Sequence, residues 1–103
     1  MNTSTFFKEI NSEITKLNEE TVKIEISIRN IKKDESAYLE HLYANKDYYQ
    51  LCIDKYKVAL RKAKLEAIRD GKEYSFKRFI RPVYLHKIDQ FMQFKRHAPV
   101  VIK

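Results

Sequence analysis

The side chains of this 103-residue sequence that are best suited to chemistry are cations repeated at helical spacing. Two sets of three cations each share one face of a helix. The first set is Lys57, Arg61 and Lys64, and the second set is Lys55, Lys62 and Arg69. Cations at such spacing can contact successive phosphates of a nucleic acid. Both sets are therefore candidate nucleic-acid contacts.

Residues 74–81 alternate aromatic and basic side chains. Basic side chains can contact phosphates, and aromatic rings can stack on unpaired bases. The candidate contacts in this segment are Tyr74, Phe76, Lys77, Arg78 and Arg81. The alternative interpretation is that Phe76 and Phe79 pack the segment onto the rest of the protein and leave its cations in water, because any amphipathic basic helix shows this pattern.

The positive charge of the chain is concentrated in its second half. Residues 1–50 carry 7 basic and 9 acidic side chains, whereas residues 51–103 carry 14 basic and 5 acidic ones. The excess behind the net charge of +7 therefore lies after residue 50. Such asymmetry indicates an anionic partner for that half, most often nucleic acid. The alternative is a charged surface that serves solubility alone.

Tyrosines and stray apolar residues are the candidates for a protein interface. Tyr48 and Tyr49 are adjacent, and neighbouring helical residues point about 100° apart, so the two rings cannot face the same seam. Tyrosine is enriched in protein interfaces, and we expect one ring of the pair at a contact. The alternative is the edge of a core, with the hydroxyls in water. Val22 and Ile26 lie outside the apolar seam expected for the first helix and are further interface candidates.

Most catalytic and metal chemistries find no support in the sequence. His41, His86 and His97 form no pair at i, i+4 spacing, and the single Cys52 belongs to no zinc motif. The one glycine excludes glycine-rich phosphate loops. We therefore expect no enzymatic activity, no cofactor, no metal and no small-molecule substrate. A lone cysteine, with neither an apolar leader nor a membrane span, predicts a cytoplasmic protein.

Apolar periodicity predicts a coiled-coil-like first helix at about residues 4–33. Steps of three and four residues connect the apolar positions Phe7, Ile10, Ile14, Leu17, Ile24, Ile28 and Ile31, with Thr21 as the interruption. Residues 22–28 also alternate β-branched and polar side chains, as a short strand would, and its partner would be residues 100–102. We favour the helix, because no Gly or Pro separates residues 18–22 from the preceding turns.

A second helix is expected at about residues 35–70, after a tight turn at residues 34–36, with Gly71 as its left-handed cap. Its apolar residues span one broad arc, made of Tyr49, Cys52, Ile53, Tyr56, Ala59, Leu60, Ala63 and Ala67. The two cation sets flank the opposite, outer surface, and between them lie Asp54, Val58 and Leu65.

Pro82 predicts a break before a third helix at about residues 82–96, because the residue before a proline disfavours helical backbone. One Gly and two Pro are too few for the turns of an all-β sandwich or barrel. We therefore predict a single all-α domain over residues 1–103. Its fold is a long, antiparallel, coiled-coil-like helical hairpin with a shorter C-terminal helix.

The expected function is binding of nucleic acid, or of a nucleic-acid–protein complex, through the C-terminal half. The 15 Lys, 6 Arg and 11 Ile indicate an AT-rich coding genome. Bacteria of that type and their phages encode many small accessory or inhibitor proteins, and we expect this chain to be one from a phage or mobile element. The alternative is an adaptor or coiled-coil module that docks on a larger protein, or forms a homodimer, without touching nucleic acid.

Overall fold

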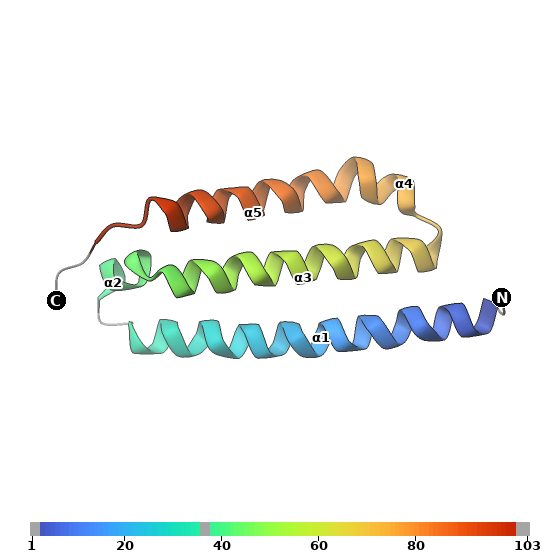
Figure 1. Cartoon of the computed structure of the whole chain (residues 1–103), viewed down its shortest axis with the longest axis horizontal. Coiled ribbons are helices and arrows are strands. Elements are labelled where there is room, and N and C mark those ends of the chain that lie inside the picture. Colours follow the sequence, from blue (N-terminus) through green and yellow to red (C-terminus); the bar gives the residue numbers. More distant parts are fainter. Residues whose placement is uncertain (1–2, 36–37, 101–103) are drawn as a thin grey trace.

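The computed structural model describes residues 3–35 and 38–100, and the only regular secondary structure in these ranges is helical (Figure 1). The elements are α1 (Thr3–Asp34), α2 (Leu39–Ala44), α3 (Lys46–Asp70), α4 (Glu73–Ser75), the π-helix η1 (Phe76–Ile80) and α5 (Arg81–Arg96). The all-α prediction, with two long helices packed against each other and a C-terminal helix, is confirmed.

The three long helices lie side by side in one layer, with α3 in the middle (Figure 1). The layer measures 59 × 26 × 16 Å, so its thickness is little more than the diameter of one helix. Its radius of gyration of 17.0 Å exceeds the roughly 13 Å of a compact 100-residue domain. Its accessible surface of 7654 Å² exceeds the roughly 6,100 Å² expected for a compact globule of this mass. Both broad faces of α3 are therefore open.

Contacts along α3 show that both neighbours run antiparallel to it. From its start to its end, α3 meets α1 in reverse order: Lys55 pairs with Glu25 at 3.4 Å, and Arg69 donates to Asn11 at 3.1 Å. On the other side the order also reverses, since the ring of Tyr49 lies 6.0 Å from that of Phe94, whereas Tyr56 meets Tyr84 at 6.3 Å. Consecutive helices therefore turn back on each other twice.

Two buried stripes on α3 produce the single layer. Val58 is buried between Lys55 and Arg61, which both pair with α1. Ala67 is buried nine residues later, about 180° around the helix, on the side that meets α5. The expectation that Val58 lies on an outer surface is therefore wrong, because that surface receives α1 instead of facing water.

The first helix matches its prediction, and the strand alternative at residues 22–28 is wrong. Ile10, Ile14 and Leu17 of the seam are buried, and the helix continues unbroken to Asp34. The alternating pattern has a helical explanation, because Ile24 is half-buried while Val22 and Ile26 lie outside the seam. Of the proposed strand partner at residues 100–102, residues 101 and 102 lie outside the described part of the chain, as does residue 36 of the expected turn.

The second helix is not continuous from residue 35 to residue 70, as the sequence predicts, but is interrupted at Asn45. Asn45 has extended backbone angles, φ −80° and ψ 103°, and its side-chain oxygen accepts a hydrogen bond from the Tyr48 N–H at 3.0 Å. An asparagine side chain competes with the helix for backbone donors and caps a new helix start. The predicted end is confirmed, because Gly71 caps α3 at φ 69°.

The expected break before Pro82 is replaced by a π-helical turn. Arg81 is helical, at φ −54° and ψ −47°, and its N–H donates to the Phe76 carbonyl five residues earlier. In an α-helix the ring of Pro82 would clash with the carbonyl four residues before it and would supply no donor. The wider π-turn accommodates both effects, so the chain from Glu73 to Arg96 remains helical.

Asn45 provides a test of this local structure. Asn45→Ala removes the cap of α3 and should lower the free energy of unfolding by about 1 kcal/mol, measured by urea denaturation. The control is Asn30→Ala, an exposed position inside α1 where alanine has the higher helix propensity, and it should leave stability unchanged or slightly raised. Equal stability of the Asn45 variant and the unmodified protein would contradict the capping role.

Candidate nucleic-acid interface

A groove between α3 and the η1–α5 segment collects the first cation set and two cations of residues 74–81. The groove has a volume of about 520 Å³. Its lining consists of Lys57, Leu60, Arg61, Lys64, Phe76, Lys77 and Arg81. We call this surface the basic groove. Helical spacing aligns its α3 cations, and the antiparallel return of the chain brings Lys77 and Arg81 opposite them.

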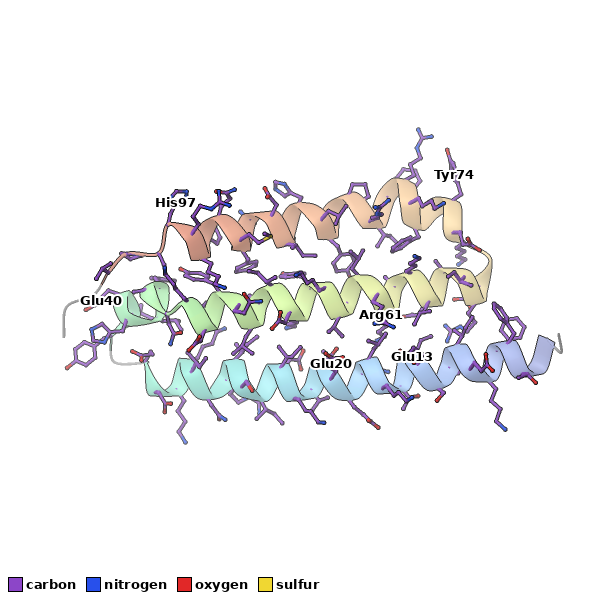
Figure 2. The ribbon with its side chains drawn as sticks, in the orientation of Figure 1. Glu13, Glu20, Glu40, Arg61, Tyr74 and His97 are labelled. Atoms are coloured by element: carbon purple, nitrogen blue, oxygen red, sulfur yellow. The ribbon has the colours of Figure 1, made fainter. Side chains whose placement is uncertain are left out.

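The basic groove is electrostatically uncompensated. Its lining includes five cations and no acidic residue. Arg61 pairs with Glu13 of α1 at 3.3 Å, and Figure 2 shows the two side chains meeting between the helices. Within residues 3–35 and 38–100, neither Lys57 nor Lys64 has an ion pair, and the same holds for Lys77 and Arg81. Four exposed cations therefore face a shared space without counter-charges.

A second, smaller groove of about 280 Å³ continues the first and shares Lys57 with it. It adds three cations that the sequence analysis missed: Lys46, Lys95 and Arg96. Helical spacing in the sequence could have identified Lys46. Lys57 and Lys64 follow it by 11 and 18 residues, so all three side chains point in nearly the same direction from a helix. Lys95 and Arg96 join it only through the tertiary fold, which places the end of α5 beside the start of α3 (Figure 1).

The second cation set does not enter either groove. Lys55 pairs with Glu25 at 3.4 Å, and Lys62 lies 4.0 Å from Glu66 on its own helix. Arg69 donates to Asp70 at 3.0 Å, and this hydrogen bond lowers the pKa of the Asp70 carboxyl. Intramolecular partners therefore occupy this set, and these positions turn toward α1 and the far face instead of the basic groove.

The aromatic residues of the 74–81 segment are not stacking platforms in the groove. Phe76 is only 4% exposed, so its assignment as a base-stacking residue is wrong, because packing onto α3 uses its ring. Tyr74 is exposed and points away from α3 (Figure 2). Arg78 donates to the Tyr74 hydroxyl at 2.6 Å and lies 5.6 Å from the centre of the Phe79 ring. The groove contacts from this segment are Lys77 and Arg81.

Some of the candidate protein-interface residues are buried in the structure, and others are exposed. Tyr49 is buried against Phe94, so it belongs to the α3–α5 core and is corrected as an interface residue. Tyr48 is half-buried, with Lys32 of α1 lying 5.9 Å from the centre of its ring. Val22 and Ile26 are exposed on α1, 53% and 48% respectively. These two side chains remain accessible to a partner.

Reactive groups are absent from the grooves. Burial raises the pKa of the Cys52 thiol, which disfavours the nucleophilic thiolate. In the described ranges, no three His, Cys, Asp or Glu side chains come together in a way that would hold a metal ion. No described helix has an apolar stretch long enough to cross a membrane. The charged side chains that line the two grooves are all cationic.

Tyr48 gives the fold a pH dependence. Burial, and next the Cys52 thiol beside it, raises the pKa of Tyr48 to about 12 from about 10 in an unfolded chain. The folded state therefore holds this proton more tightly, so the stability that Tyr48 contributes is fully present below pH 10 and is lost as pH rises toward 12. We expect the urea midpoint to fall across that interval, and to fall less in Tyr48→Phe. Tyr38→Phe, at an exposed ring that takes no part in raising this pKa, should show the full fall, and equal behaviour of both variants would refute the assignment.

Comparisons with known proteins found no protein similar to this chain. No protein-family model, no curated protein and no solved structure matches it. Two connected grooves on one face of the helical layer gather eight cations from α3, η1 and α5.

Proposed function

We propose that this protein binds nucleic acid through the basic groove. The observation that supports the proposal is the convergence of five cations on one groove whose lining contains no acidic residue. Like charges held together by a fold repel each other, and a polyphosphate chain removes that repulsion while releasing its own condensed counterions. The Lys- and Ile-rich amino-acid composition, which is typical of AT-rich coding genomes, fits a small accessory or inhibitor protein of a phage or mobile element that acts on nucleic-acid machinery.

Charge-matched variants test the site. One triple variant removes groove cations, Lys57→Gln, Lys64→Gln and Lys77→Gln, and its control removes Lys8, Lys23 and Lys87, which line neither groove. Affinity for labelled single-stranded RNA, single-stranded DNA and duplex DNA is measured by fluorescence anisotropy between about 50 and 200 mM salt. The groove variant should bind about tenfold or more weakly and lose about 0.7–0.9 in log–log salt slope per removed contact.

The control variant keeps the same net charge as the groove variant, so it separates a site from a general charge effect. It should retain the affinity and salt slope of the unmodified protein to within a small factor. Equal losses in the two variants would overturn the groove as the site. Failure of the unmodified protein to bind any of the three nucleic acids at the lower salt would overturn the proposed function itself.

A second candidate function is self-association through the opposite face of the layer. There a groove of about 580 Å³ exposes Phe79 and Val83, 62% and 58% respectively, beside Ala63 and Ala67 of α3. Glu66 of its lining follows Lys64 by two residues, about 200° around α3, so this groove and the basic groove open on different faces.

A second copy of the chain suits this apolar groove. The rim carries both signs of charge, Glu66 and Asp70 with Lys72, so a two-fold related copy meets opposite charges, which the basic groove would not allow. A face 59 Å long and 26 Å wide can supply the roughly 800 Å² that each partner of a stable interface buries.

Sedimentation equilibrium tests self-association. The unmodified protein should show a concentration-dependent mass approaching twice that of the chain, and Phe79→Glu with Val83→Glu should remain monomeric while staying helical by circular dichroism. Val22→Glu with Ile26→Glu places the same charges on exposed apolar positions of α1 and should still dimerise. A monomer at all concentrations would exclude the homodimer and leave the apolar face to a different protein.

A further inference from the structure

We infer that the two connected grooves hold one single strand of nucleic acid by its phosphodiester backbone, over no more than about eight nucleotides and without reading its bases. This inference rests on the proposed function and specifies its ligand. It follows from three properties of the grooves: their concave position between two helices, the length of their cation rows and the side chains of their floor.

The position of the grooves favours a thin ligand. Their cations line both sides of a hollow between α3 and the η1–α5 segment, and helices in contact lie about 8–10 Å apart. A duplex reader inserts a protruding helix into a major groove about 12 Å wide. Here α3 is flanked by α1 on one side and α5 on the other (Figure 1), so it cannot protrude in that way. One strand can lie along this hollow and meet cations on both sides, whereas a duplex would rest on the helices beside it and meet fewer of them.

The length of the cation rows sets the size of the site. The α3 row runs from Lys46 to Lys64, which is about 27 Å at 1.5 Å per residue. On the opposite side the lining cations form two pairs, Lys77 with Arg81 at one end and Lys95 with Arg96 at the other. Stacked nucleotides repeat every 3.4 Å along one strand, so the α3 row spans about eight phosphates, and fewer if the strand is extended.

The floor of the grooves explains why bases would not be read. The aromatic ring that lines them, Phe76, is buried, and the other apolar side chains are Leu60, Ile53 and Met92. Base stacking in single-strand binders needs exposed aromatic faces, and the edges of adenine and cytosine are recognised by amide and carboxylate side chains. Gln50, the one amide in the lining, already donates to Asp54 and accepts from Lys95 at 2.6 Å. The bases would therefore face outward.

An oligonucleotide length series tests this inference on the full chain. Affinity for oligo-dT and oligo-rU of 4 to 20 nucleotides is measured by anisotropy competition at about 50 mM salt, where phosphate contacts are strong. Affinity should rise steeply with length up to about eight nucleotides and then increase only slowly. Oligo-dA and oligo-dC of the same length should bind within a few-fold of oligo-dT, and a matched duplex should bind about tenfold or more weakly.

A pair of variants tests the extent of the site. Lys46→Gln with Arg96→Gln removes the far end of the second groove, so the length at which affinity levels off should become shorter while the shortest oligonucleotides keep their affinity. Lys23→Gln with Lys87→Gln removes the same charge outside both grooves and should change neither.

The outcomes separate this inference from the proposed function. Duplex affinity equal to or above single-strand affinity, a strong preference for one base, or a length dependence that stays steep beyond about eight nucleotides would each overturn the single-strand inference, and binding weakened by the groove variants would still support the proposed function. No binding of any nucleic acid would overturn both.

Discussion

The whole structure depends on α3 being packed from two opposite sides. Its buried residues form two stripes, marked by Val58 and Ala67, that lie about 180° apart around the helix axis. A helix with two opposite apolar stripes joins its neighbours in a row, whereas one broad stripe would gather them into a bundle. The 16 Å thickness of the layer follows directly, and so does the exposure of both its broad faces.

The two open faces differ in charge because the direction in which each α3 side chain points is fixed by its position along the helix. Residues that point between the two stripes of α3 reach neither neighbour, so they remain at the surface. On one face these are cations such as Lys57 and Lys64, and on the other they include Glu66. The burial of apolar residues on α3 and the exposure of its cations on one face are therefore consequences of the same arrangement, since rotating the helix would destroy both.

The sequence predicts those features of the structure that neighbouring residues determine strongly, and it misses those that small energy differences decide. The seam of α1 and the Gly71 cap follow from spacing and from backbone conformation, and both are predictable. The break at Asn45 depends on a side-chain cap whose free energy differs little from that of a continuous helix, so helix propensity alone does not predict it. The π-turn before Pro82 depends on a local change of backbone hydrogen bonding, which residue propensities also do not predict.

The sequence also predicts only part of the candidate site. The cations on α3 are predictable from spacing, but Lys95 and Arg96 join them only through the return of α5. Acidic residues decide which of the equivalent-looking cations remain unpaired: Glu25 pairs with Lys55 and Glu13 with Arg61, and both belong to α1. Because α3 separates α1 from α5, the described carboxylates of α1 pair with cations of α3 and form no ion pair with the groove cations of η1 and α5. The charge asymmetry along the sequence thus becomes an asymmetry in space, and it leaves the cations that line the grooves from η1 and α5 available to the anionic ligand proposed above.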